Sequence, residues 1–534
     1  MKFALSVFLF FIPYTFLQAQ SPIVEWQKCF GGSDSERPGS SIQLADSNYI
    51  VVGSTGSNDG DVSGNHGVQD VWIAKFDQIG NIIWQKCIGG SYNDFGMRIF
   101  NTSNNNIFIV GVSGSFDGDV SGNHSAISHY DIWGIMLDDQ GNMLWQKCYG
   151  GSGDEFAYKV IETSDSSLLL AGSTTSNDFD VSGNHSQDTL DVWVIKIDMS
   201  GNLIWQKCLG GTNDDKAYSI CQAYDGGYLI IGSTMSNNGD VNDLHDSIGN
   251  YADIWLMKIS SVGVLESERT LGGSATDIGW DVQQDFNFTY TLIGHTTSFD
   301  GDINSNHSTN YTYDVWMANI DSTGNILWQK NFGGSASDFG YSFIKTNQGY
   351  LISGETISID GDVSGLHTQN GPDLWVFGID SLRNLLWQKC YGGTDDELYS
   401  STLNSLDGGF LISAMSQSNN GDVSGHHNPN YASDFWLLKI SEPYVSVSEE
   451  TTNLFLLSSY FKDDENLHLV FNSNDNETFN IQLMDITGKT FLKSTFDSSV
   501  GKNEFDIPIK NLIKGIYIVR LQFKNKIFTS KVVY

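Results

Sequence analysis

Positive charge is scarce in this chain: 28 of its 534 residues are Lys or Arg, against 63 Asp and Glu, which gives a formal net charge of -35. A protein this acidic repels phosphate backbones, so we expect no nucleic-acid partner, whereas cations, basic proteins and neutral glycans remain candidates. Proline is also rare, with 7 residues, which excludes a Pro-rich disordered chain.

Long hydrophobic runs are absent beyond the N-terminus. No later segment has 18 consecutive apolar residues, so we expect no transmembrane segment in the mature protein. The N-terminus itself is typical of a secretory signal, because Lys2 supplies a positive start, Phe3–Leu17 is apolar, and small residues near Ala19 offer a cleavage site. Residues 1–19 are therefore predicted to be a signal peptide.

The cysteines are few and their positions do not predict a disulfide framework. Five of the six directly follow Trp-Gln-Lys in a repeat, but two equivalent positions hold Thr270 and Asn331, and paired bridges would not be scattered in this way. We interpret them as buried small hydrophobic residues, with disulfide pairing as the less favoured alternative. The six are Cys29, Cys87, Cys148, Cys208, Cys221 and Cys390.

Seven repeated units of about 60 residues dominate what is present. A Gly-Gly pair begins each unit, and an Asp-x-Trp motif follows in every one. The second unit shows four strand-like runs, at Phe95–Phe100, Ile107–Val112, Asp131–Leu137 and Met143–Tyr149. Seven β-rich units of this length predict a β-propeller with four-stranded blades.

The two ends of the repeat array predict how the ring closes. The chain starts with a lone Trp26-Gln27-Lys28 strand, and the last unit stops after Trp436–Ile440 without that strand. The N-terminal strand is therefore predicted to complete the seventh blade, which leaves no large unpaired sheet face at the seam. The predicted fold is all-β: a seven-bladed β-propeller over residues 22–441, followed by a small β-sandwich domain.

The repeated stretches also resemble a known family. Gly89-Gly90-Ser91, Asp94-Phe95-Gly96, Ile107–Gly111 and Asp131-Ile132-Trp133 are similar to the repeats of the seven-bladed β-propeller family. The resemblance covers residues 22–441 and implies the fold. That family has no single function, so the resemblance implies no activity.

A different pattern follows the repeats. Residues 442–453 are polar and are expected to form a linker. Residues 454–534 contain short strand-like runs at Leu467–Phe471, Phe479–Asp485, Ile516–Phe523 and Ile527–Val533, which predict the β-sandwich.

This C-terminal segment resembles the C-terminal sorting domain of the type IX secretion system. The matching features are Met484–Lys489, Leu512 with Gly515-Ile516-Tyr517, and the terminal Lys531-Val532-Val533. The resemblance implies the secretion machinery as a partner, and a secreted or outer-surface location in a Gram-negative bacterium. The usual Tyr-Pro-Asn-Pro opening is missing, with Ser458–Phe461 near its place, so the domain start is not fixed. The alternative is a generic β-sandwich stalk.

An acidic motif recurs between the second and third strands of each unit, and in the first unit it runs from Asp59 to His66. Its oxygen donors fall on alternate residues, as at the start of a calcium loop, and a downstream residue such as Asp70 or Asp131 is the candidate for the missing distal ligand. Ca²⁺ is therefore a candidate cofactor. The candidate ligands are Asp59, Asp61, Ser63, Asp117, Asp119, Ser121, Asp178, Asp180, Ser182, Asn238, Asp240, Asn242, Asp300, Asp302, Asn304, Asp360, Asp362, Ser364, Asn420, Asp422 and Ser424.

A local explanation competes with calcium and is favoured over it. Asp, Asn, Ser and Gly also build self-bonded turns without any metal. The His that ends each motif suggests zinc or manganese, but packing or hydrogen bonding within the loop is the favoured role, since calcium sites use oxygen ligands.

A second acidic residue stands five positions beyond the first Gly of each pair. The loop that carries it runs from an outer strand to the next inner strand, so we expect a ring of seven carboxylates at the mouth of the central channel, with raised pKa values or bound cations. In the alternative, favoured for stability, each acid accepts N–H bonds within its own turn. The seven are Glu36, Asp94, Glu155, Asp215, Asp277, Asp338 and Glu397.

No catalytic signature is present: the chain has no Gly-x-Ser-x-Gly, no His-Glu-x-x-His and no phosphate loop. The clearest departure from the repeat, Glu266–Arg269 in place of Trp-Gln-Lys, is interpreted as repeat decay. We therefore expect a secreted or cell-surface binding or adhesion module, not an enzyme, with an unknown glycan or surface protein as partner. The alternative is an extracellular polysaccharide hydrolase or lyase, which predicts one distinct cleft with a carboxylate of raised pKa.

Overall fold

The computed structural model describes two stretches of the chain, each with short gaps. Within them every regular element is a β-strand. The chain divides into one compact unit over Gln18–Val445 and another that contains Ser446–Tyr534. The predicted signal peptide lies outside the described residues. The described residues are 21–442 and 458–533, except for 126–127, 187, 246–249, 286, 308–310, 368–370, 428–431, 464–465, 474–475, 477, 486–488, 510–511, 513–515 and 523–526.

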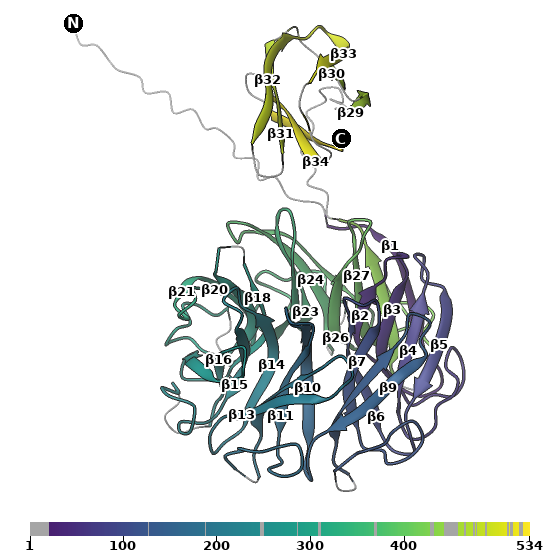
Figure 1. The fold of residues 1–534 in the computed structure, drawn as a ribbon, viewed down its shortest axis with the longest axis vertical. Helices are drawn as coiled ribbons and strands as arrows, with labels where there is room; N and C mark the ends of the chain where they lie inside the picture. The colour runs from purple at the N-terminus through teal and green to yellow at the C-terminus, as the bar shows by residue number, and fades with distance from the viewer. Residues whose placement is uncertain are drawn as a thin grey trace, which may run out of the picture. The chain divides into compact units, whose positions relative to one another are not determined.

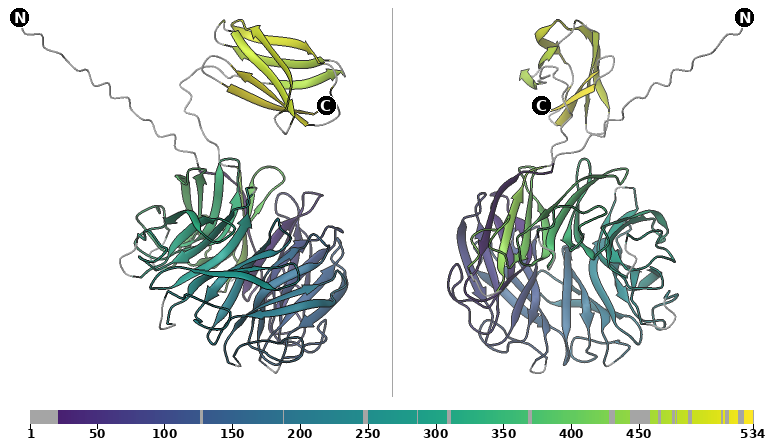
Figure 2. Two further views of the ribbon diagram at one scale, coloured as in Figure 1. Left: turned by 60° about the vertical axis from the view of Figure 1, so that its left-hand side comes forward. Right: turned by 180° about the vertical axis from the view of Figure 1, so that it is seen from behind.

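The first unit is a ring of seven four-stranded antiparallel sheets, which confirms the predicted propeller (Figure 1). In each blade the strands follow one another outward from the channel, as in the order β2-β3-β4-β5 of blade 1. Figure 2 shows the blades around the ring from two further directions. The second blade matches its four expected strands to within one residue at each end.

The strands fall into four sets by their place in the blade. The inner strands are β2 (Glu36–Gln43), β6 (Asp94–Asn101), β10 (Glu155–Glu162), β14 (Asp215–Gln222), β18 (Asp277–Gln284), β22 (Asp338–Lys345) and β26 (Glu397–Asn404). The second strands are β3 (Tyr49–Thr55), β7 (Ile107–Ser113), β11 (Leu168–Thr174), β15 (Tyr228–Thr234), β19 (Tyr290–Thr296), β23 (Gly349–Thr356) and β27 (Phe410–Ser416). The third strands are β4 (Asp70–Phe76), β8 (Asp131–Leu137), β12 (Asp191–Ile197), β16 (Asp253–Ile259), β20 (Asp314–Ile320), β24 (Asp373–Asp380) and β28 (Asp434–Ile440). The outer strands are β1 (Val24–Phe30), β5 (Ile82–Ile88), β9 (Met143–Tyr149), β13 (Leu203–Leu209), β17 (Leu265–Leu271), β21 (Ile326–Phe332) and β25 (Leu385–Tyr391).

The N-terminal strand closes the ring, as predicted. β1 pairs antiparallel with β28, with Trp26 opposite Lys439 and Cys29 opposite Trp436. Blade 7 is therefore built from both ends of the propeller sequence, and Figure 1 shows purple β1 beside the green strands of that blade.

The core lies between the blades. The second and third strands are apolar on both faces because each blade is covered by its two neighbours, and nearly all their residues are buried. The six cysteines are free, four of them buried in this core, in agreement with their interpretation as small hydrophobic residues. The largest core side chains are the tryptophans of the Asp-x-Trp motif: Trp72, Trp133, Trp193, Trp255, Trp316, Trp375 and Trp436.

Topology divides the connections between two faces of the ring. We call the end with the tight turns the turn face; in blade 1 its turns are 44–48 and 77–81. The other end, the loop face, carries the long connection 56–69 and the link 89–93 to the next blade. The tight turn after β4 is held by Asp77, whose carboxylate accepts the backbone N–H of Asn81 at 2.8 Å, while Gly80 adopts the left-handed conformation with φ 75°.

The second unit contains a three-stranded and a four-stranded sheet around an apolar core that includes Phe471, Phe479 and Val519. All four expected strands are present, and three strands that the sequence patterns did not reveal accompany them: β29, β32 and β33. Two of them, β32 and β33, have few buried residues, which explains the missed signal. The strands are β29 (Ser458–Asp463), β30 (Asn466–Ser473), β31 (Thr478–Asp485), β32 (Thr490–Asp497), β33 (Gly501–Pro508), β34 (Ile516–Gln522) and β35 (Ile527–Val533).

Candidate functional site

The acidic motif of the loop face is anchored within its own blade. Its first residue accepts a hydrogen bond from the loop that enters the blade: the Asp59 carboxylate accepts the backbone N–H of Ser33 at 2.7 Å, and this bond lowers the pKa of Asp59. The fourth residue, Val62 in blade 1, is a buried apolar anchor. The same acceptor position is used in all seven blades, by Asp59, Asp117, Asp178, Asn238, Asp300, Asp360 and Asn420.

The last and third residues of the motif connect neighbouring blades. His245 Nδ1 lies 2.8 Å from Oδ2 of Asp253 in its own blade, and its Nε2 lies 3.4 Å from Oδ2 of Asp302 in the next. The bond to Asp253, followed by the bond to Asp302, raises the pKa of His245 to about 10, so the ring is protonated at neutral pH. The bond from Nδ1 to the Asp that starts the third strand forms in all seven blades. The third-position residues are Asp61, Asp119, Asp180, Asp240, Asp302, Asp362 and Asp422.

The fifth residue bonds to the Trp-Gln-Lys strand. Gln85 Nε2 donates to Ser63 Oγ at 2.6 Å, and Gln85 Oε1 accepts the Nε1–H of buried Trp72 at 2.9 Å. One glutamine therefore accepts the N–H of the core tryptophan and also holds the loop through its serine. Ser121, Ser182, Ser364 and Ser424 bond in the same way, whereas in blade 5 the backbone N–H of Asn304 donates to Gln329.

Blade 4 keeps this connection but forms it with different side chains. Glu268 replaces the glutamine and Asn242 replaces the serine. Asn242 Nδ2 donates to Glu268 Oε1 at 2.9 Å, and Trp255 Nε1 donates to Glu268 Oε2 at 3.1 Å. Glu268 therefore keeps both hydrogen bonds that the glutamine makes in other blades, and Asn stands at the serine position in blade 5 as well.

The seven acids that start the inner strands are fully buried, and each accepts a backbone N–H from its own loop, so the expected ring at the channel mouth stays a prediction. The Asp94 carboxylate accepts bonds from the Gly90 N–H and from the hydroxyls of Ser113 and Ser115. These are the local bonds of the alternative explanation. Burial raises the pKa to about 6 for Asp94 and to about 7 for Glu36, Glu155, Asp215, Asp277, Asp338 and Glu397.

The repeated oxygen donors do not converge on a common point. Those of one motif bond to a loop N–H, to a His ring and to a glutamine, and within the described ranges no group of three or more His, Cys, Asp or Glu is arranged to hold a metal ion. The downstream Asp residues pair with the histidines instead. Their other oxygen, Oδ1, is buried without a hydrogen-bond partner among the described residues in six blades, at Asp70, Asp131, Asp191, Asp314, Asp373 and Asp434. Calcium binding stays a prediction.

The channel wall breaks the symmetry of the ring. Four inner strands place aromatic side chains at one equivalent position, and these contact one another across blades 3 to 6, with ring centroids 4.3 to 5.3 Å apart. The other three blades have Gly39, Met97 and Ser400 there. An alignment of the seven repeats shows this difference at a single position, whereas the motifs shared by all seven repeats do not include it. The aromatic residues are Tyr158, Tyr218, Trp280 and Tyr341.

A buried carboxylate lies at one end of this aromatic arc. Glu355 of β23 is 8% exposed, its Oε1 accepts the Tyr341 hydroxyl at 2.7 Å, and its Oε2 has no partner with hydrogen-bond geometry among the described residues. Burial raises the pKa of Glu355 to about 6, with a further contribution from Asp396. The equivalent position in the preceding blade is His295, whose pKa burial lowers to about 3 and whose Nδ1 accepts the Trp280 N–H at 2.9 Å.

The loop face also exposes aromatic rings on some blades only. Phe299 and Tyr311 of the β19–β20 loop are 44% and 71% exposed, and their rings meet edge to face at 6.1 Å. Tyr92 and Phe116 form a similar pair in blade 2 at 6.4 Å. Phe179 of blade 3 is exposed beside the ring of His124. These aromatic side chains contribute little to the core and stand among Asp, Asn and Ser side chains.

Comparison with known proteins supports the C-terminal assignment. Residues 464–534 match the model of the Secretion system C-terminal sorting domain. No curated protein matches the chain in sequence. The chain is therefore a seven-bladed β-propeller protein with a C-terminal sorting domain. More particularly, the tail is that of type IX secretion, which indicates export to the cell surface or the medium.

Similar solved structures resemble this chain in fold alone. The WD40 domain of Neurospora crassa Pan2 is 9% identical, with a TM-score of 0.41 over 75% of this chain and 89% of that one. A thermostable family-43 glycoside hydrolase is 10% identical, with a TM-score of 0.30 over 60% of this chain and 97% of that one. A family-43 arabinoxylan arabinofuranohydrolase of Bacillus subtilis is 10% identical, with a TM-score of 0.27 over 94% of each chain. Scores this low carry no argument about activity.

No helix in the described part of the chain is long and apolar enough to cross a membrane.

Proposed function

We propose that the propeller is an extracellular binding module that takes a neutral glycan on its loop face. The observation that carries the proposal is the exposed Phe299–Tyr311 pair. Sugar rings present apolar C–H faces that stack on aromatic rings, and their hydroxyls bond to the amide and carboxylate side chains around them. Exposed aromatic side chains grouped on one face are typical of recognition surfaces.

Charge and export support a neutral extracellular ligand. The net charge of -35 disfavours anionic polysaccharides and leaves neutral ones as the better match. The sorting domain would place the propeller where such polymers are met. Most of the repeated motif residues are already engaged in blade contacts, so recognition is assigned to residues that differ between blades.

Affinity electrophoresis of the full chain through gels that contain single neutral polysaccharides tests this proposal. We expect at least one polymer to retard the protein, and Phe299→Ala with Tyr311→Ala to weaken that binding about tenfold or more, the loss of 1.4 kcal/mol or more typical of a hot spot. The matched control is Tyr224→Ala with Phe288→Ala, an exposed aromatic pair at 5.1 Å on the turn face, which should bind like the wild type. Equal loss in both double variants would contradict a loop-face site.

The hydrolase alternative has one specific observation in its favour. Glu355 is a buried carboxylate of raised pKa beside Tyr341, at a position that differs between blades, as a catalytic acid would be. We expect no new reducing ends when the full chain is incubated with the polymer it binds. Release of reducing ends by the wild type that Glu355→Gln abolishes, with binding unchanged, would establish the hydrolase instead.

A further inference from the structure

Tryptophans on several outer strands contact the next blade on the turn face. Four of them lie flat over a glycine of the neighbouring tight turn, where a Cβ would come within 2.8 to 3.0 Å of the indole ring. The indole N–H is also used: Trp26 Nε1 donates to the carbonyl of Gln78, and Trp145 Nε1 to that of Met199, both at 3.0 Å. The pairs are Trp26 with Gly80, Trp84 with Gly141, Trp145 with Gly201 and Trp205 with Gly263.

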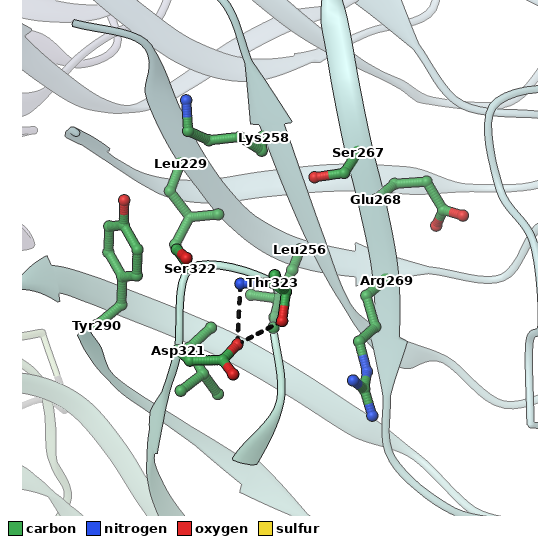
Figure 3. A pocket seen from close by; sticks show the side chains of 12 residues that line it. Leu229, Leu256, Lys258, Ser267, Glu268, Arg269, Tyr290, Asp321, Ser322 and Thr323 are labelled. Carbon is green, nitrogen blue, oxygen red and sulfur yellow. Dashed lines mark hydrogen bonds between the residues drawn. The ribbon is translucent and has the colours of Figure 1, made fainter. Parts of the chain in front are cut away.

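Blade 4 lacks this tryptophan but keeps the rest of the contact. Ser267 stands in its place on β17, and the facing turn still has its left-handed glycine, Gly324, with φ 84°. The three atoms nearest to a Cβ at Gly324 all belong to the Arg269 side chain, whose Cδ would lie 3.1 Å away. The missing ring leaves a pocket, and Figure 3 shows Ser267 and Arg269 on one side of it with the Asp321–Thr323 turn facing them.

The walls of this pocket match those around the tryptophans of other blades. Its buried apolar surface comes from Leu229, Leu256 and Tyr290. Leu229 occupies the repeat position of Phe108, whose ring packs 5.8 Å from that of Trp145 in blade 2. The carbonyl of Ser322 stands at the repeat position of the Gln78 and Met199 acceptors. An apolar floor, a glycine in the facing turn and a carbonyl acceptor are therefore in place without the indole ring.

We propose that this pocket binds the tryptophan side chain of a partner protein. The occupant is argued from the chain's own equivalent sites, where an indole ring fills the same place between two blades, and from the continuity of the pocket with that blade interface. A single tryptophan in a preformed pocket is a frequent anchor of protein interfaces. The site lies on the turn face, so it goes beyond the glycan binding proposed for the loop face, and either proposal can fail without the other.

The probe for the test is N-acetyltryptophanamide, added to the full chain and followed by ligand-observed NMR and by thermal melting. We expect saturable binding with an upward shift in melting temperature. N-acetylphenylalaninamide should bind more weakly, because it lacks the ring N–H. In Ser267→Trp the chain fills its own pocket, so the melting temperature should rise without any probe, and probe binding should be lost.

A matched variant makes the same vacancy elsewhere. Trp145→Ser in blade 2 should lower the melting temperature and add a second probe site, with part of the lost melting temperature restored by the probe. Probe binding by Trp145→Ser but not by the wild type would overturn the proposal, since it would show that the blade 4 pocket does not admit an indole ring. Unchanged binding in Ser267→Trp, or no binding to any of the three proteins, would overturn it as well.

Discussion

At the scale of single residues, the protein buries carboxylates in a regular array. Each blade has one fully buried acid at the start of its inner strand and one at the start of its third strand. In blade 2 the first acid faces Gly89 together with Asp70 of blade 1, and a Cβ at that glycine would clash with both carboxylates. Two buried like charges this close favour protonation of one of them.

The pH dependence of stability follows from the sign of these shifts. Carboxyl groups with pKa values of about 4 in the unfolded chain have values of about 6 to 7 in the folded one. Their stabilising contribution is complete below the unfolded pKa and is lost as pH rises through the folded pKa. We therefore expect the melting temperature to fall from pH 4.5 to pH 8, with up to about 1.4 kcal/mol of unfolding free energy lost per pH unit for each group.

Melting curves between pH 4.5 and 8.5 measure this effect. Protonated His245, with its pKa raised by Asp253 and Asp302, adds a further loss in the same direction at higher pH. Glu155→Gln should flatten the profile, since one titrating group is removed while its acceptor oxygen is kept. Asp139→Asn, at an exposed turn, is the control and should leave the slope unchanged. A melting temperature that rises with pH over this range would refute the assignment.

At the scale of elements, the outer strand of blade 4 shows which part of a repeat can change. β17 has lost the Trp-Gln-Lys sequence, yet it keeps its pairing with β16 in the register of the other blades. Glu268 keeps the hydrogen bonds of the glutamine that it replaces, whereas Ser267 does not replace the lost indole ring and leaves a pocket. The strand is held by its ladder and by the glutamate, so the missing indole does not remove the element.

Glu268 is the shared acceptor of this link, so its removal should be costly. Glu268→Ala leaves the N–H of buried Trp255 without its acceptor and Asn242 without its partner, so we expect a loss of about 1–3 kcal/mol in unfolding free energy. Glu268→Gln keeps an acceptor oxygen for Trp255 and creates the Asn–Gln combination of blade 5, so it should retain most of the stability. Denaturant unfolding of the wild type and both variants measures the two losses. Equal losses in the two variants would contradict this role of Glu268.

At the scale of the whole molecule, the seven blades form one ring through bonds that cross from blade to blade. The His of one loop reaches an Asp of the next, and the outer strand of one blade contacts the turn of the next. The last contact, from His427 to Asp61, joins blade 7 to blade 1 at 3.4 Å. Five of the seven blade pairs have such a His–Asp contact on the loop face, from blade 3 through blade 7 to blade 1.

These side-chain contacts affect how calcium could bind to the loops. Because the side chains of the acidic motif are engaged separately, calcium would have to break these bonds before its ligands could converge. We expect the melting temperature of the full chain to be the same in millimolar calcium and in excess chelator. A calcium-dependent rise of several degrees would show that the loops rearrange around the ion, and would restore the metal site.

The sequence by itself determined the architecture of this protein. The spacing of Gly-Gly and Asp-x-Trp specified seven units, the lone Trp26 strand specified the closure, and the terminal motifs specified the sorting tail. These features are periodic or contiguous, so they can be recognised along the chain without any knowledge of contacts.

Only the tertiary structure decided what the repeated polar residues do. The oxygens of Asp59, Asp61 and Ser63 alternate along the chain like calcium ligands, yet they bond to a loop, to the His of another blade and to the glutamine of an outer strand. Such partners lie tens to hundreds of residues away, and side-chain direction across a blade interface is not encoded in local spacing. The exposed Phe299–Tyr311 pair, buried Glu355 and the pocket at Ser267 depend likewise on which faces the neighbouring blades cover.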